Sequence, residues 1–132
     1  MKVLVCGGRD MDDDELVFFT LDQLHAKEPI KVIIEGGARG ADRHAKAWAE
    51  GHGICVMTFF ANWDHDGKAA AGPIRNARML KYGQPDMVLA FPTPDSKGTW
   101  DMIRRTERAG VRLAVFEVGG SNGNDIHTEA ED

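Results

Sequence analysis

Five short apolar stretches alternate along the chain with segments of helical character, and this alternation limits the possible folds more than any other feature. The stretches are residues 2–6 (KVLVC), 31–35 (KVIIE), 54–59 (ICVMTF), 86–91 (DMVLAF) and 112–118 (RLAVFEV). Their lack of polar alternation is typical of strands covered on both faces. Strands that alternate with helices predict right-handed crossovers and a mostly parallel sheet. We therefore expect an α/β fold, a three-layer Rossmann-like sandwich with a mostly parallel five-stranded sheet.

Four helices are expected between these strands: after the acidic residues 12–15, over about 40–51, over about 73–83, and from about 98 to Gly110. We interpret the acidic run as carboxylates that cap a helix N-terminus rather than as a metal site. Pro73 suits a first helical turn, so the third helix is predicted to begin there. The preceding residues, 60–72, are predicted to form a long loop rich in glycine and alanine.

The chain has 132 residues, 42% of them hydrophobic and 28% charged, which is typical of one globular domain. We expect that domain to cover residues 1–118. The remaining residues, 119–132, are small, polar and acidic, and are expected to form a flexible tail. Because no apolar run approaches the roughly 18–20 residues that span a bilayer, no membrane association is expected.

Charge and cysteine usage narrow the partners and the compartment. Sixteen Lys and Arg against 21 Asp and Glu give a net charge of −5, which argues against a nucleic-acid partner. Cys6 and Cys55 lie in apolar runs without CxxC spacing. We interpret both as buried, reduced thiols of a cytoplasmic protein. Asp64, His65 and Asp66 lack the spacing of a calcium loop, so neither a metal nor a cofactor is expected.

The turns after the first, second and fourth strands are the candidates for a binding site. In an open parallel sheet, ligands bind beyond the carboxyl ends of the strands, where the strand order reverses. Glycine lets the backbone approach a ligand, and helix N-termini offer free N–H groups. One glycine turn alone is weak evidence, but three that meet at one edge predict an anion-binding rim. The candidates in these turns are Gly7, Gly8, Arg9, Gly36, Gly37, Ala38, Asp42, Lys97, Gly98 and Thr99.

Two further candidates, Arg75 and Asn76, fall in the first turn of the expected third helix. A guanidinium there can reach a phosphate or a ribose, or it can pair with a loop carboxylate. Trp63 in the loop before it either stacks on a base or fixes the loop to the domain. The motifs GxxxxGKS/T and GxGxxG are both absent. Their absence argues against a P-loop NTPase and an ordinary dinucleotide dehydrogenase.

Four segments taken together carry a family resemblance: KVLVCGGRD, IIEGGARGADRHAKAWA, GPIRNARML, and DMVLAFP followed by KGTWDMIRR. They closely resemble the small YspA or cpYpsA-related proteins of the SLOG superfamily, which occur in bacteria and phages. The resemblance covers about residues 2–118. Related members are the LOG phosphoribohydrolases and the Rossmann-like core of the DNA-processing protein DprA. The resemblance implies a Rossmann-like fold and a pocket for a nucleotide or a nucleotide-derived ligand of the ADP-ribose or NAD type.

The LOG enzymes, by this resemblance, carry PGGxGTxxE and a helix-borne Arg-Lys pair. Residues 94–99 (PDSKGT) match the spacing of that motif but replace Gly-Gly with Asp-Ser. The catalytic glutamate position falls on Met102, with Asp101 one residue earlier, whereas Arg75 matches the arginine and Asn76 takes the lysine position. The resemblance therefore implies a retained binding apparatus and a missing or displaced catalytic carboxylate.

Two functions follow from these observations; a third, a protein or DNA interaction module suggested by the kinship with DprA, is disfavoured for DNA by the acidic net charge. In the first, the chain is a sensor or binding module whose ligand phosphate lies near residues 98–99, aided by Arg75 and Lys97, while Asp42 or Asp10 holds ribose hydroxyls. The alternative is a LOG-like N-glycoside hydrolase of nucleoside monophosphates. There Arg75 would hold the phosphate and Asp101 would stabilise an oxocarbenium-like centre or activate water. The expected partners are a small nucleotide-derived ligand and, by analogy with LOG-like relatives, a second copy in a homodimer.

Overall fold

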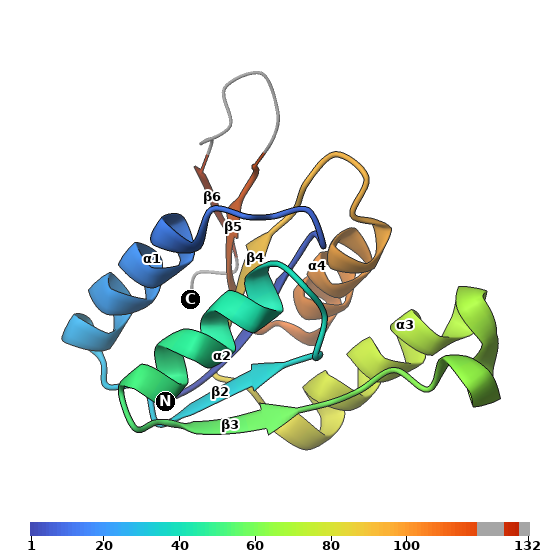
Figure 1. Cartoon of the computed structure of the whole chain (residues 1–132), viewed down its shortest axis with the longest axis horizontal. Helices are drawn as coiled ribbons and strands as arrows, with labels where there is room; N and C mark the ends of the chain where they lie inside the picture. Colours follow the sequence, from blue (N-terminus) through green and yellow to red (C-terminus); the bar gives the residue numbers. More distant parts are fainter. Residues whose placement is uncertain (119–125, 130–132) are drawn as a thin grey trace.

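The computed structural model describes residues 1–118 and 126–129, and strands alternate with helices through most of this length (Figure 1). The elements are β1 (Lys2–Gly7), α1 (Asp14–Lys27), β2 (Val32–Glu35), α2 (Ala41–Gly51), β3 (Cys55–Thr58), α3 (Trp63–Gly83), β4 (Met87–Phe91), α4 (Lys97–Ala109), β5 (Arg112–Phe116) and β6 (Ile126–Glu129). The five predicted strands and four predicted helices are all present. Among the described residues, no helix is long and apolar enough to cross a membrane.

The six strands form one sheet in the order β3-β2-β1-β4-β5-β6. Strands β1 to β5 run parallel to one another, with Leu4 of β1 opposite Ile34 of β2 and Val88 of β4. The chain begins in the middle of the sheet, adds β2 and β3 on one side, and then crosses to add β4 and β5 on the other. The strand order therefore reverses between β1 and β4, which is where a parallel sheet opens a crevice at its carboxyl edge.

Two apolar clusters hold the helices to the two faces of the sheet. On one face, Leu21 of α1 and Trp48 of α2 pack with sheet residues such as Phe91. On the other face, Met79 of α3 and Met102 of α4 pack with the residues of the sheet that point the opposite way. Burying a large apolar side chain contributes roughly 1.5–3 kcal/mol, so both layers are strongly held. The three-layer Rossmann-like sandwich expected from the sequence is confirmed.

Helices α1, α2 and α4 agree with the sequence expectation. The acidic run caps α1, because the Asp13 carboxylate accepts a hydrogen bond from the Leu16 N–H at 3.0 Å. Helix α2 buries Ala45 and Trp48 on one face. Helix α4 ends at Gly110, whose left-handed backbone (φ 70°) closes the last turn.

Helix α3 begins ten residues earlier than predicted, at Trp63 rather than Pro73, so most of the expected loop is helical. The Asn62 side chain caps this start by accepting from the His65 N–H at 3.2 Å. The alanines 69–71 also favour a helix. Gly67, with φ 82° and ψ 167°, divides α3 into two parts, and Pro73 lies inside the second. The first part projects away from the sheet in Figure 1.

Two other expectations are corrected. Cys6 is buried as expected, but Cys55 is exposed because β3 is an edge strand of the sheet. Residues 126–129 of the expected tail form β6, which pairs antiparallel with β5. Such edge pairing uses backbone groups and needs no apolar pattern, so composition did not reveal it. The rest of the predicted tail, 119–125 and 130–132, lies outside the described residues.

Candidate functional site

A cleft of about 690 Å³ lies beyond the carboxyl ends of the parallel strands, where the turns after β1, β2 and β4 meet. All of the residues named as binding candidates line it: Gly7, Gly8, Arg9, Gly36, Gly37, Ala38, Asp42, Arg75, Asn76, Lys97, Gly98 and Thr99. Asp10 lines it as well, whereas Asp101 is not part of the lining. The structure therefore brings the binding candidates together and leaves one of the two catalytic candidates outside.

The β2–α2 turn is held by two carboxylates of the chain itself. Oδ2 of Asp42 accepts hydrogen bonds from the N–H groups of Gly36 at 3.0 Å and Ala38 at 3.3 Å. Oε1 of Glu35 accepts from the N–H of Gly37 at 2.6 Å. Three consecutive backbone donors are thus occupied. Although this turn opens with paired glycines, these three amides are not free to bind an external anion.

Both of these acids are buried, Glu35 at 1% and Asp42 at 4% exposure, and of the two only Asp42 lines the cleft. Burial raises the pKa of Asp42 to about 7; the nearby Glu35 also raises it, while the Arg75 guanidinium and the backbone N–H donors oppose the rise. The Thr58 hydroxyl donates to the second oxygen of Glu35. Sequence analysis missed Glu35. The available signal was a carboxylate that ends an otherwise apolar strand, since a buried acid requires partners.

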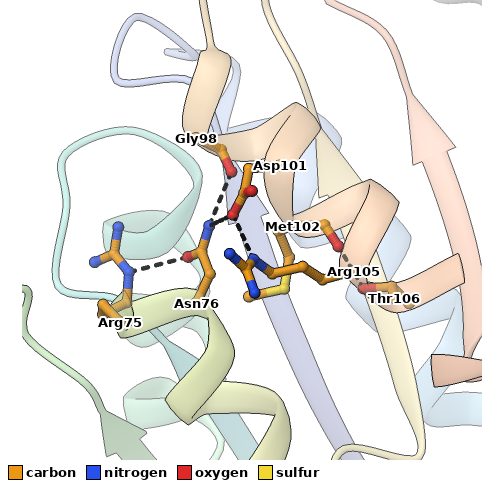
Figure 2. Close-up of polar contacts among 7 residues, drawn as sticks. All are labelled: Arg75, Asn76, Gly98, Asp101, Met102, Arg105 and Thr106. Carbon is orange, nitrogen blue, oxygen red and sulfur yellow. Dashed lines mark hydrogen bonds and ion pairs between the residues drawn. The ribbon is translucent and has the colours of Figure 1, made fainter. Parts of the chain in front are cut away.

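Arg75 reaches from α3 to the β2–α2 turn. Its Nη1 donates to the carbonyl oxygen of Gly36 at 2.7 Å. Its Nε donates to Oδ1 of Asn76 at 3.1 Å, a bond shown in Figure 2. A guanidinium has five N–H donors, so these two bonds orient the group and leave others for a ligand. Arg75 therefore stands as a preoriented cation in the wall of the cleft.

Asn76 ties α3 to α4 beneath the cleft. Its Nδ2 donates to the carbonyl oxygen of Gly98 at 3.0 Å and to Oδ2 of Asp101 at 3.1 Å (Figure 2). The same Asp101 oxygen accepts from Nε of Arg105 at 2.8 Å. Partial burial raises the pKa of Asp101, but the hydrogen bonds from Arg105 and Asn76 outweigh it and hold the pKa below its ordinary value. This carboxylate is an ionised link between two helices.

The β4–α4 turn leaves the N-terminus of α4 open to the cleft. Ser96 Oγ fixes the turn through bonds of 2.8 Å to both the N–H and the carbonyl oxygen of Thr93. Lys97, Gly98 and Thr99 follow and line the cleft, and this first helical turn carries no acidic residue. Within the described part of the chain, the Gly98 N–H has no acceptor. A free N–H at a positively charged helix end suits an anion.

Aromatic and charged side chains form the other walls of the cleft. Phe60 and Trp63 line the side that follows β3, and the Arg9 guanidinium lies 5.7 Å from the centroid of the Trp63 ring. Cys6 also lines the cleft, but burial and the nearby Asp42 raise the pKa of its thiol, so it is not a thiolate nucleophile. Across residues 1–118 and 126–129, no group of three or more His, Cys, Asp or Glu side chains is placed to hold a metal ion.

Comparison of the sequence with known proteins identifies the family of this chain. A model of the YspA, cpYpsA-related SLOG family matches residues 1–65. The chain is also 37% identical over 121 residues to the Gene 61 protein of Mycobacterium phage D29, an alignment that covers 87% of this chain and 95% of the phage protein. The chain belongs to the YspA, cpYpsA-related SLOG family. Membership in this SLOG family indicates a nucleotide-related binding or hydrolase module.

Residues 94–102, which resemble the LOG motif, lack its glutamate, and this difference bears on catalysis. Met102, at the position of the catalytic glutamate, is fully buried in the core beneath α4. Asp101 precedes it and is turned about 100° around the helix, where it bonds to Asn76 and Arg105. The structure thus places no carboxylate of α4 in the lining of the cleft.

Proposed function

We propose that this SLOG protein binds a nucleotide or nucleotide-derived ligand in the cleft and acts as a sensor or binding module. The ligand phosphate lies at the N-terminus of α4. The observation that carries this proposal is the Gly98 N–H in the first turn of that helix, which has no acceptor among the described residues; Gly98 and the cation Lys97 both line the cleft. A volume of about 690 Å³ is in the range for small-molecule and cofactor sites.

Side chains around the cleft complement such a ligand. Arg75 is already oriented by Gly36 and Asn76, so it loses little side-chain freedom when it binds an anion. Arg9 is exposed on the β1–α1 turn and adds charge at the rim. A charge-assisted hydrogen bond contributes roughly 1.5–3 kcal/mol, so a few such contacts account for micromolar affinity.

The hydrolase alternative has no comparable support. Asp101 lies outside the cleft lining, and its carboxylate is already bound by Asn76 and Arg105. The role of Asp101 in a hydrolase would be to stabilise an oxocarbenium-like centre or to activate water, and both roles require its carboxylate to face the ligand, which it does not. Binding without hydrolysis is therefore the function that we propose.

Calorimetric titration with AMP, ADP-ribose, NAD and adenosine tests the proposal. We expect the phosphorylated ligands to bind more tightly than adenosine. Lys97→Ala should weaken AMP binding about 3- to 10-fold, because it removes one partly solvated charge contact. Lys27→Ala is the matched control, since Lys27 is an exposed lysine at the far end of α1 and is not in the cleft lining.

Two results would refute the phosphate site at α4. One is adenosine binding as tightly as AMP, which would show that the phosphate contributes nothing. The other is an AMP affinity that Lys97→Ala changes no more than Lys27→Ala does. Circular dichroism of each variant should match wild type, which keeps any loss of affinity separate from a loss of fold.

A further inference from the structure

The end of the cleft away from α4 carries two exposed aromatic side chains. In the sheet, β4 lies on one side of β1, while β2 and β3 lie on the other side. The residues that follow β3 therefore lie across the cleft from the β4–α4 turn. Phe60 is 70% exposed and Trp63 is 44% exposed, and both line the cleft. Two large aromatic groups left open to solvent in one concave site are typical of a surface that is covered by a ligand.

The ring of Phe60 is seated on Gly37. A Cβ added to Gly37 would lie 2.5 Å from Cε1 of Phe60, and Gly37 itself has a positive φ of 74°. A side chain at this position would displace the ring. The missing side chain of Gly37 therefore makes room for one side of the ring, while the high exposure of Phe60 leaves its remaining surface open on the cleft.

This end of the cleft is poorly suited to a second phosphate. Glu35 and Asp42 occupy the N–H groups of Gly36, Gly37 and Ala38, so these three amides are not available to a phosphate. The two buried acids also repel an anion when ionised. Arg39 and Arg43 line the cleft and are exposed to solvent, as Lys97 is at the other end, so exposed cations do not distinguish the two ends. An uncharged, flat group fits this surface better than an anionic one.

We propose that Phe60 is the stacking platform for the aromatic base of the ligand, with Trp63 as the neighbouring wall. This inference rests on the proposed function, because it assumes that the phosphate lies at α4. It defines the ligand class as a nucleotide that spans the cleft, its base on Phe60 and its phosphate at Gly98. A sugar phosphate without a base would lose the stacking contact and bind more weakly.

The test compares AMP with ribose 5-phosphate on wild type, Phe60→Ala and Phe60→Trp. We expect wild type to prefer AMP. Phe60→Ala should weaken AMP binding about 5- to 150-fold, the range for loss of one base–aromatic stack, and should change the affinity for ribose 5-phosphate less than about twofold. Phe60→Trp keeps a ring and should retain the preference. Phe19→Ala is the matched control, since Phe19 is 61% exposed on α1 and is not in the cleft lining.

A fluorescence signal provides a readout that a purely structural role would not change. Ethenoadenosine 5′-monophosphate, a fluorescent AMP analogue, should be quenched when its base stacks on wild type and should stay bright with Phe60→Ala at saturating protein. Loss of quenching in that variant supports stacking. Equal quenching in both proteins, at matched saturation, overturns it.

The outcomes separate this inference from the proposed function. If wild type binds AMP and ribose 5-phosphate equally well, or if Phe60→Ala weakens both alike, stacking is overturned while the phosphate site stands. If neither phosphorylated ligand binds wild type, the proposed function itself fails. If Phe60→Ala instead changes the sedimentation of the protein and leaves AMP affinity intact, Phe60 belongs to an interface between copies, and the stacking proposal is wrong.

Discussion

The β2–α2 and β4–α4 turns look alike in sequence but differ in what their backbone can bind. Both follow a parallel strand, lead into a helix, contain glycine and line the same cleft. In the first turn, Glu35 and Asp42 already bind three consecutive N–H groups. In the second, the Gly98 N–H has no acceptor among the described residues. On our proposal, a glycine turn after a strand binds phosphate only where the chain's own carboxylates leave an amide free.

The two turns also differ in packing. Gly40 has a positive φ of 81°, and a Cβ added there would clash with the carbonyl oxygen of Gly8. A Cβ added to Gly98 would meet nothing within 4 Å. The first turn is thus a rigid, closely packed corner that joins two loops, whereas the second is an open helix end. Close packing at Gly40 stabilises the fold, whereas the open space at Gly98 leaves room for a ligand.

The largest expected effect distinguishes these two glycines. Gly40→Ala combines left-handed backbone strain with a backbone clash and should lower the free energy of unfolding by about 3 kcal/mol. Gly98→Ala adds a methyl in open space in a helix and should be neutral or stabilising by up to about 1 kcal/mol. Urea unfolding monitored by circular dichroism measures both. Similar losses in the two variants would contradict the contrast.

A smaller effect concerns the pH dependence of stability. Burial raises the pKa of Asp42 from its ordinary 3.8 to about 7, so between these values the folded protein binds a proton that the unfolded chain releases. The stability contributed by this group is full below pH 3.8 and is lost as pH rises through 7. Asp42→Asn keeps an oxygen acceptor without the charge. Relative to wild type, this variant should therefore gain stability between pH 5 and pH 8.

The matched control for that experiment lies in the other turn. Asp95 is exposed in the β4–α4 turn and lines the same cleft. The stability of Asp95→Asn relative to wild type should stay constant over this pH range. Urea unfolding at pH 5, 6, 7 and 8 gives the comparison. If Asp42→Asn follows the same flat course as Asp95→Asn, the buried carboxylate does not carry the expected proton.

The sequence allowed the fold and the meeting of the three turns to be predicted because these depend on local patterns. Apolar runs identify strands, and parallel strands bring their carboxyl ends to one edge. The start of α3 was placed wrongly because Pro73 outweighed the Asn62 cap and the alanines before it. Glu35 was missed because its partners Gly37 and Thr58 meet only in the folded sheet.

The two catalytic candidates show that sequence alone does not establish which way a helical side chain faces. The sequence places both Arg75 and Asp101 near the start of helices that border the cleft, yet only Arg75 lines it. On a helix, one residue corresponds to a turn of about 100°, so the direction of Asp101 depends on how α4 packs against the sheet. That orientation is set by the burial of Met102 and Ile103, which pattern alone gives only approximately.

The most direct test is an amide ¹⁵N–¹H NMR titration with ribose 5-phosphate, which carries a phosphate but no aromatic base to disturb nearby shifts. The account predicts that the Gly98 amide proton moves downfield by the largest amount as it gains an acceptor, while the amides of Gly36, Gly37 and Ala38 stay nearly fixed on their carboxylates. Large shifts at those three amides with Gly98 unchanged would contradict it, because the phosphate would then occupy the turn that we describe as closed.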